Sequence, residues 1–204
     1  MMENSGTPGI CHEENADRNR ENKDVAEFMT MWTAQTDQVL ETLERGGIYF
    51  VKKEYITQKY GNTAWIFQEA YRFFTERAKH IVPQPEEAQS PVWMFGDKKW
   101  AAPVGGGYRL ELRIPREELI LFDRRLWSKI LNLSYIGTKE QETEFQHKLH
   151  RMGIADSIEV FLKPYYPLLK TEILKSWERL FTEACPELEY VQGAAWMIKK
   201  EWIV

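Results

Sequence analysis

The segment "YRLELRI", residues 108–114, constrains the fold of this chain more than any other feature. Apolar residues at 108, 110, 112 and 114 fall on one side of an extended backbone, and charged residues at 109, 111 and 113 fall on the other. This alternation is typical of a β-strand with one buried face and one wet face. The sequence therefore predicts a sheet with a core on at least one side.

Other segments are also predicted strands. "FMTMWTAQ" (28–35) and the closing "GAAWMIKKEWIV" (193–204) are apolar on both faces, as inner strands are. "IYFV" (48–51), "VWMF" (92–95) and a short strand before Asp123 complete the set. Because the first and last ordered elements are both strands and helices alternate irregularly between them, we expect an α+β fold with a mixed, largely antiparallel sheet and packed helices.

Helix signals lie between these strands. A short helix is capped by Thr36 or Asp37 and stopped by Gly46 or Gly47, and another helix follows an Asp123 cap. Two helical pieces between 156 and 184 are divided by "KPYYP", and the stretch after 133 is polar. The main helix lies within 61–82, and its apolar positions are Ile66, Ala70, Phe73, Phe74 and Ile81.

Composition limits the classes of function that fit this chain. Residues 1–27 are polar and without apolar periodicity, so we expect a flexible leader before one globular domain at 28–204. The net charge of −4 makes general nucleic-acid binding unlikely. Cys11 and Cys185 lie far apart, and there is neither a signal peptide nor a membrane-length apolar run, so a cytoplasmic protein without membrane contact is expected. Eight tryptophans call for a large core or a stacking site.

Few motifs point to catalysis. His147 and His150 have no partner pair, so no metal site is expected, and "VGGGYRL" precedes a strand, which favours a hairpin loop over a phosphate loop. No G-x-S-x-G sequence is present. What remains are aromatic and polar residues near strand and helix ends. The candidate binding residues are Trp32, Thr33, Gln35, Trp93, Phe95, Asp123, Glu178, Arg179 and Gln192.

Several of these candidates also have a purely structural interpretation. Asp123 is expected to cap a helix, and Trp127 and Trp196 are expected in the core. In "KSWERLF" (175–181) helical geometry separates neighbouring side chains by about 100°. Trp177 then belongs to the core, while Glu178 can pair with Lys175, and Arg179 can pair with Glu183 or Glu172, along exposed sides.

Residues 31–204 resemble a bacterial family of unknown function, domain-of-unknown-function family 3841. The matching blocks are "MWTAQT", "AYRFFTERAKHI", "PVWMF", "RLELRIPREELILFDRRLWSKILN", "SWERLF" and "VQGAAWMIKKEWI". The family pattern reads S-D-F-D where this chain has Phe122, Asp123, Arg124 and Arg125, so one carboxylate of the motif is missing. The resemblance implies a fold and no established activity.

The order of elements also resembles that of ADP-ribosyltransferase-like proteins, which bind NAD beside the first strand. This resemblance implies binding of NAD or a related nucleotide between 32–35 and 93–95. The usual His or Arg of the first strand and the late Glu are absent, which implies either loss of catalysis or use of Glu178, Arg179 or Glu201. The alternative is a non-catalytic domain with a Trp-rich core and one protein-binding patch.

Overall fold

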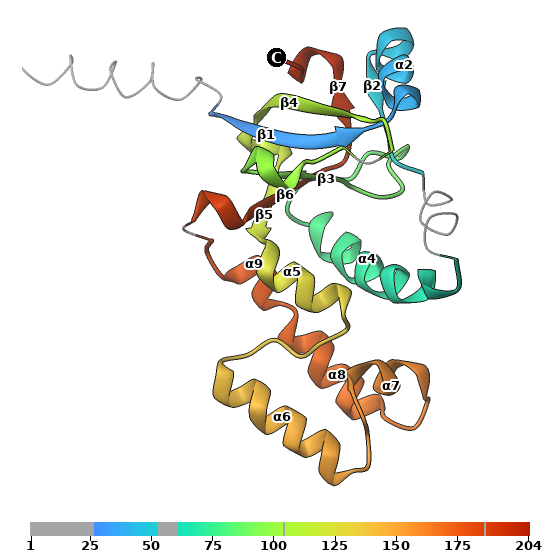
Figure 1. The fold of residues 1–204 in the computed structure, drawn as a ribbon, viewed down its shortest axis with the longest axis vertical. Coiled ribbons are helices and arrows are strands. Elements are labelled where there is room, and N and C mark those ends of the chain that lie inside the picture. The colour runs from blue at the N-terminus through green and yellow to red at the C-terminus, as the bar shows by residue number, and fades with distance from the viewer. Residues whose placement is uncertain (1–26, 53–60, 104, 186) are drawn as a thin grey trace, which may run out of the picture.

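The computed structural model describes residues 27–52, 61–103, 105–185 and 187–204 (Figure 1). The leader expected at 1–27 lies outside these ranges except for its last residue. Within the described part of the chain, no helix has both the length and the apolar character needed to cross a bilayer.

A five-stranded antiparallel sheet forms the centre of the molecule, in the order β4-β1-β3-β6-β5. Its strands are β1 (Phe28–Gln35), β3 (Val92–Phe95), β4 (Tyr108–Pro115), β5 (Ile120–Asp123) and β6 (Val191–Ala195). Two short strands, β2 (Ile48–Tyr49) and β7 (Ile198–Lys199), pair separately. The predicted α+β class is confirmed, and all pairs between these strands are antiparallel.

Helices cover both faces of the sheet (Figure 1). Their bounds are α2 (Asp37–Gly46), α4 (Ala64–Ala78), α5 (Arg124–Leu131), α6 (Lys139–Arg151), α7 (Ser157–Leu162), α8 (Pro167–Ser176) and α9 (Arg179–Thr182). We call the side that packs on α2 the α2 face and the opposite side the α4 face. Helices α6, α7 and α8 form the end of the molecule furthest from the sheet (Figure 1).

Each face has its own hydrophobic core. On the α2 face the alternating side of β4 packs with Met31 and Met94 against Val39 and Leu43 of α2. On the α4 face Phe122 packs with Phe74, and this core continues through α5 into the distal helices. Leu110, Leu112 and Ile114 are buried as predicted, whereas Tyr108 at the end of the strand is exposed.

Helix ends follow the local chemistry. Gly47 stops α2 with a left-handed backbone, φ 74°, which costs glycine no steric strain. Asp123 caps α5 by accepting a hydrogen bond from the backbone N–H of Arg125. Pro167 begins α8, where its fixed φ suits the first helical position.

The polar stretch after residue 133 holds a helix that the apolar pattern did not predict. Helix α6 begins with a capping box in which the Thr138 side chain accepts from the Gln141 backbone N–H, and the Gln141 side chain accepts in return. Only Phe145 and Leu149 are buried on it. The T-x-x-Q spacing was the available signal, and two buried residues were too few to reveal a helical period.

Two predictions about individual side chains were wrong. Ile81 is 52% exposed because α4 ends at Ala78, before the stripe reaches it. Glu178 pairs with Arg77 of α4 and not with Lys175, because α8 ends at Ser176 and the chain turns there. Trp127, Trp177 and Trp196 are buried as expected.

Strand β6 lies close under Met31 because residue 193 is glycine. A Cβ at Gly193 would meet the Met31 Cε at 2.6 Å, well inside van der Waals contact. Met31 is fully buried, so it cannot simply swing into solvent. The glycine therefore sets how closely the α2 core packs on the centre of the sheet.

We expect Gly193→Ala to lower the free energy of unfolding by about 1–3 kcal/mol, because the added methyl overpacks this core. Met31→Leu removes the atom that the methyl would meet. Urea unfolding of the two single variants and the double variant gives the coupling between the sites. Simple additivity of the two losses would contradict this assignment.

Candidate functional site

Side chains of four neighbouring strands form a line across the α4 face. The ladder pairs Glu111 with Trp32, Trp32 with Phe95, and Phe95 with Gln192. Directly paired residues of antiparallel strands project from the same face of a sheet. We call Glu111, Trp32, Phe95 and Gln192 the cross-strand row, and its next neighbour on β5 is Phe122.

The row marks where the helical cover of this face ends. Phe122 is 1% exposed and packs against α4, whereas Trp32 and Phe95 are only half-buried. Six of the eight tryptophans pack in the two cores, namely Trp65, Trp93, Trp127, Trp177, Trp196 and Trp202. Trp32 and Phe95 belong to neither core. Two adjacent aromatic rings thus keep surface that the described residues do not cover.

Gln192 adds a polar group at the buried end of the row. Its side chain is 6% exposed, and it makes no hydrogen bond to any residue in the described ranges. In those ranges, the side-chain nitrogen or oxygen atoms that have neither solvent contact nor a hydrogen-bond partner are the hydroxyl oxygens of Ser90 and Ser157. The Gln192 amide is not among them. The Gln192 amide therefore still reaches the surface.

A stacked pair borders the row. The guanidinium carbon of Arg124 lies 3.5 Å from the ring centroid of Trp100, and the Trp100 indole N–H donates to the Glu189 carbonyl oxygen at 2.9 Å. Arg124 follows Phe122 by two residues, and Glu189 precedes Gln192 by three. The short helix η2 (Lys98–Trp100), which carries Trp100, also contacts β1.

The wet side of β4 gives this region positive charge. Arg109 and Arg113 flank Glu111 on the same face and are exposed. Arg113 lies over the Phe28 ring, 4.8 Å from its centroid. Across the described residues, neither of these arginines nor Arg124 forms an ion pair. Unpaired guanidinium groups beside exposed rings suit an anionic ligand that carries a planar ring.

Three other predicted site residues have structural contacts. The Thr33 hydroxyl, on the α2 face, donates to the Trp93 carbonyl oxygen at 2.9 Å and accepts from the Gln35 amide at 2.8 Å. Trp93 packs in the α4 core, with ring centroids 4.8 Å from those of Phe74 and Trp127. Thr33 and Gln35 therefore stabilise the sheet on the side opposite the row, and Trp93 packs in the core next to the row.

Asp123 holds the start of α5. Its carboxylate accepts from the Arg125 backbone N–H at 2.7 Å and from the Arg125 guanidinium at 2.6–3.0 Å. Burial raises the pKa of this carboxyl, but the hydrogen bonds from Arg125 outweigh burial, so the pKa lies below the ordinary value. Burial also raises the pKa of the neighbouring Cys185 thiol, which makes it a poor nucleophile.

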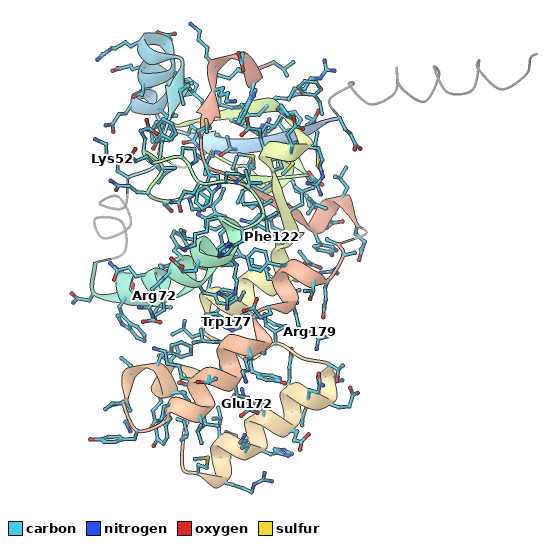
Figure 2. All side chains as sticks on the ribbon, turned by 180° about the vertical axis from the view of Figure 1, so that it is seen from behind. Lys52, Arg72, Phe122, Glu172, Trp177 and Arg179 are labelled. Carbon is cyan, nitrogen blue, oxygen red and sulfur yellow. The ribbon has the colours of Figure 1, made fainter. Side chains whose placement is uncertain are left out.

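Glu178 and Arg179 lie away from the row, on the side of the distal helices. Figure 2 shows Arg179 with Trp177 among the helices, beyond Phe122. Arg179 pairs with Glu183 and donates to Gln141 at 3.2 Å. Glu178 pairs with Arg77 at 2.6 Å across a groove of about 360 Å³ between α4 and α8. The groove lining is Glu69, Arg72, Phe73, Glu76, Arg77, Thr171, Leu174, Lys175 and Glu178.

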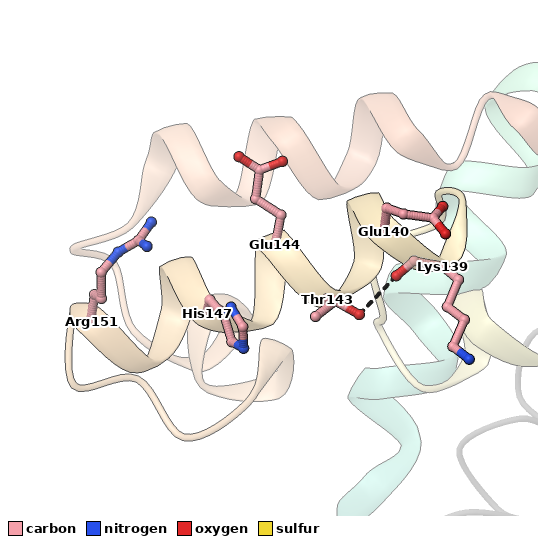
Figure 3. Close-up of a pocket in the computed structure, with 6 residues that line it drawn as sticks. All are labelled: Lys139, Glu140, Thr143, Glu144, His147 and Arg151. Atoms are coloured by element: carbon pink, nitrogen blue, oxygen red, sulfur yellow. Dashed lines mark hydrogen bonds between the residues drawn. The ribbon is translucent and has the colours of Figure 1, made fainter.

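A second depression lies along α6 alone (Figure 3). Its lining residues, all exposed, are Lys139, Glu140, Thr143, Glu144, His147 and Arg151. One helix face cannot enclose a ligand, so this is a shallow surface feature. Over the described ranges, no group of three or more His, Cys, Asp or Glu side chains is arranged to hold a metal ion.

Trp100, Arg124, Arg109 and Arg113 are site residues that no sequence pattern singled out. Signals for two of them were present. Trp100 is a large aromatic residue in a polar, glycine-rich segment, and Arg124 replaces a phenylalanine of the family pattern. The arginines of β4 were assigned to the wet face of a strand, and only the sheet order places them beside Trp32.

We expect Asp123→Ala to lower the free energy of unfolding by about 1–2 kcal/mol at pH 7, because the α5 cap is lost. Asp123→Asn keeps the cap and removes the charge. Since the folded-state pKa of Asp123 is lowered, its contribution is present above the unfolded-state pKa and is lost as the pH falls through the folded-state pKa.

Urea unfolding between pH 7 and pH 3 measures this contribution. The Asn variant is expected to lose less stability than wild type on acidification. Equal destabilisation by Asn and Ala at pH 7 would show that the charge and not the cap matters.

Comparison with known proteins places the chain in a family. No curated protein and no solved structure matches it. A family model described as a domain of unknown function (DUF3841) matches residues 30–204. This match includes every residue of the cross-strand row, so the row lies inside the domain that defines the family. The chain belongs to the DUF3841 family.

Proposed function

We propose that this protein binds a nucleotide, NAD or a related compound, on the cross-strand row. The observation that carries the proposal is the pair Trp32 and Phe95, which lie in register on adjacent strands and outside both cores. A protein that needed these rings only for stability would gain more by packing them in a core.

The aromatic pair supplies the ring-binding part of such a site. A nucleobase or nicotinamide ring stacked on an aromatic side chain contributes about 1–3 kcal/mol in nucleic-acid sites. Neighbouring strands lie about 4.8 Å apart, so Trp32 and Phe95 are spaced for one ligand to contact both. The ligand would lie across the strands, along the row.

The flanking charges supply the remaining contacts. Arg109, Arg113 and Arg124 can each donate paired hydrogen bonds to phosphate oxygens. Glu111, which pairs with Trp32, offers a carboxylate that can accept from ribose hydroxyl groups, as acidic residues do in dinucleotide sites. Base, sugar and phosphate thus each have a complementary group near the row.

We propose nucleotide binding and not a catalysed reaction, because the catalytic candidates named from the sequence lie away from the row. Glu178 and Arg179 lie toward the distal helices, and Glu201 lies on η5 (Lys200–Trp202), whose Trp202 packs on the α2 face. The carboxylate on the row is Glu111. Any ADP-ribosyl transfer at this site would therefore use Glu111 in place of the three residues named from the sequence.

A second candidate function, protein binding, is favoured by one feature at the distal end. Leu162, Tyr165 and Leu168 are 61%, 78% and 85% exposed around the turn between α7 and α8. Large apolar side chains gathered on one turn are typical of a protein contact. This apolar turn and the cross-strand row lie on separate parts of the molecule, so both functions can coexist.

We expect Trp32→Ala to weaken nucleotide binding by roughly 5-fold to 150-fold, which corresponds to the loss of one stacked ring. Isothermal titration calorimetry with NAD, ADP-ribose and ATP measures the change. Tyr165→Ala is the matched control, because it removes an exposed aromatic ring far from the row. Absence of heat and of any thermal shift with wild type at millimolar ligand would disprove nucleotide binding.

For the apolar turn, we expect a photo-crosslinking amino acid at position 165 to capture one defined protein in cells. Leu162→Ser with Leu168→Ser should abolish that product, because the contact surface becomes polar. The same crosslinker at the exposed position 146 on α6 is the control. An equal pattern of products from both positions would count against a specific interface.

A further inference from the structure

Gln192 differs from the other buried polar residues of the sheet. Thr33 and Asp123 are also buried, and each has hydrogen-bond partners in the protein. Gln192 is 6% exposed, and no hydrogen bond joins its side chain to the described residues. It stands on a strand paired on both sides, in register with Phe95 and Phe122.

An amide in this position is unfavourable in the unliganded protein. Its oxygen accepts and its nitrogen donates, and burial leaves both with little contact to water while no described residue pairs with either. Leucine or methionine would fill the same space without this penalty. The amide is therefore available to pair with a group that reaches this part of the surface from outside the described protein.

We propose that Gln192 determines ligand specificity by pairing with a planar edge that carries one hydrogen-bond donor and one acceptor. The carboxamide of nicotinamide and the amino edge of adenine are such edges. This inference rests on the proposed nucleotide binding. A glutamine amide forms two hydrogen bonds with an edge of this kind, as it does with adenine in nucleic acids.

The order of the row supports this role. Phe95 lies between Trp32 and Gln192, so a ring stacked near Phe95 presents its rim to the next strand, about 4.8 Å away. Arg109, Arg113 and Arg124, which form no ion pair with the described residues, serve the phosphates. Gln192 is uncharged and both donates and accepts, which fits it to the ring edge and not to a phosphate.

Four ligands test the assignment by calorimetry. They are NAD, nicotinic acid adenine dinucleotide, nicotinamide hypoxanthine dinucleotide and ADP-ribose. The second changes only the carboxamide, and the third changes only the adenine edge. We expect wild type to bind one of the two altered dinucleotides at least about 10-fold more weakly than NAD. We expect Gln192→Leu to bind NAD and that altered dinucleotide with similar affinity.

Thermal unfolding without ligand provides an independent measurement. Gln192→Leu should raise the Tm by about 2–6 °C, because it replaces an almost fully buried amide, which no described residue pairs with, by an apolar side chain. Gln84→Leu is the matched control and should lower the Tm, since the Gln84 amide donates to the Ala88 carbonyl oxygen at 2.6 Å. Gln192→Met tests the same point if the leucine variant does not fold.

The outcomes separate the two proposals. If wild type binds none of the four ligands, nucleotide binding fails and this assignment fails with it. If wild type binds them and Gln192→Leu keeps the same preference, nucleotide binding stands and the role of Gln192 is wrong. The role is also wrong if wild type binds NAD and both altered dinucleotides equally, or if Gln192→Leu and Gln192→Met lower the Tm.

Discussion

The pairing of β1 with β3 is the contact on which the arrangement of the sheet depends. Strand β1 forms an eight-residue ladder with β4, but it meets β3 through a short pairing centred on Trp32 and Phe95. This short pairing joins the β4-β1 ribbon to the three strands that α4 and α5 cover. The α4 core therefore ends at the junction, and the two junction residues are left half-buried at its margin.

The same junction explains how the aromatic residues are divided. Six tryptophans build cores because helices pack over them, and the Trp93 ring is enclosed by Phe74 and Trp127. Trp32 is near Trp93 in the sheet and shares its face, yet among the described residues it packs in neither core. Both rings are half-buried, but Trp93 packs against the α4 core and Trp32 packs in neither core, so position and not residue type separates them.

Local sequence signals predicted most elements of the fold correctly. Alternation located β4, a glycine located the end of α2, and the Asp123 cap located the start of α5. Helix α6 was missed because its two buried residues give almost no period. The partner of Glu178 was missed because Arg77 lies 101 residues away, and no local rule connects them.

The sequence by itself determined most of the strands and helices, α6 excepted, and which side of β4 is apolar, because these depend on neighbours within one or two turns of the chain. Only the tertiary structure decided that Trp32, Phe95 and Gln192 lie side by side near arginines of β4 and α5, while Glu178 and Arg179 turn toward other helices. The physical reason is strand order: the cross-strand row joins residues 32, 95, 111 and 192, and long-range pairing alone brings them to one face.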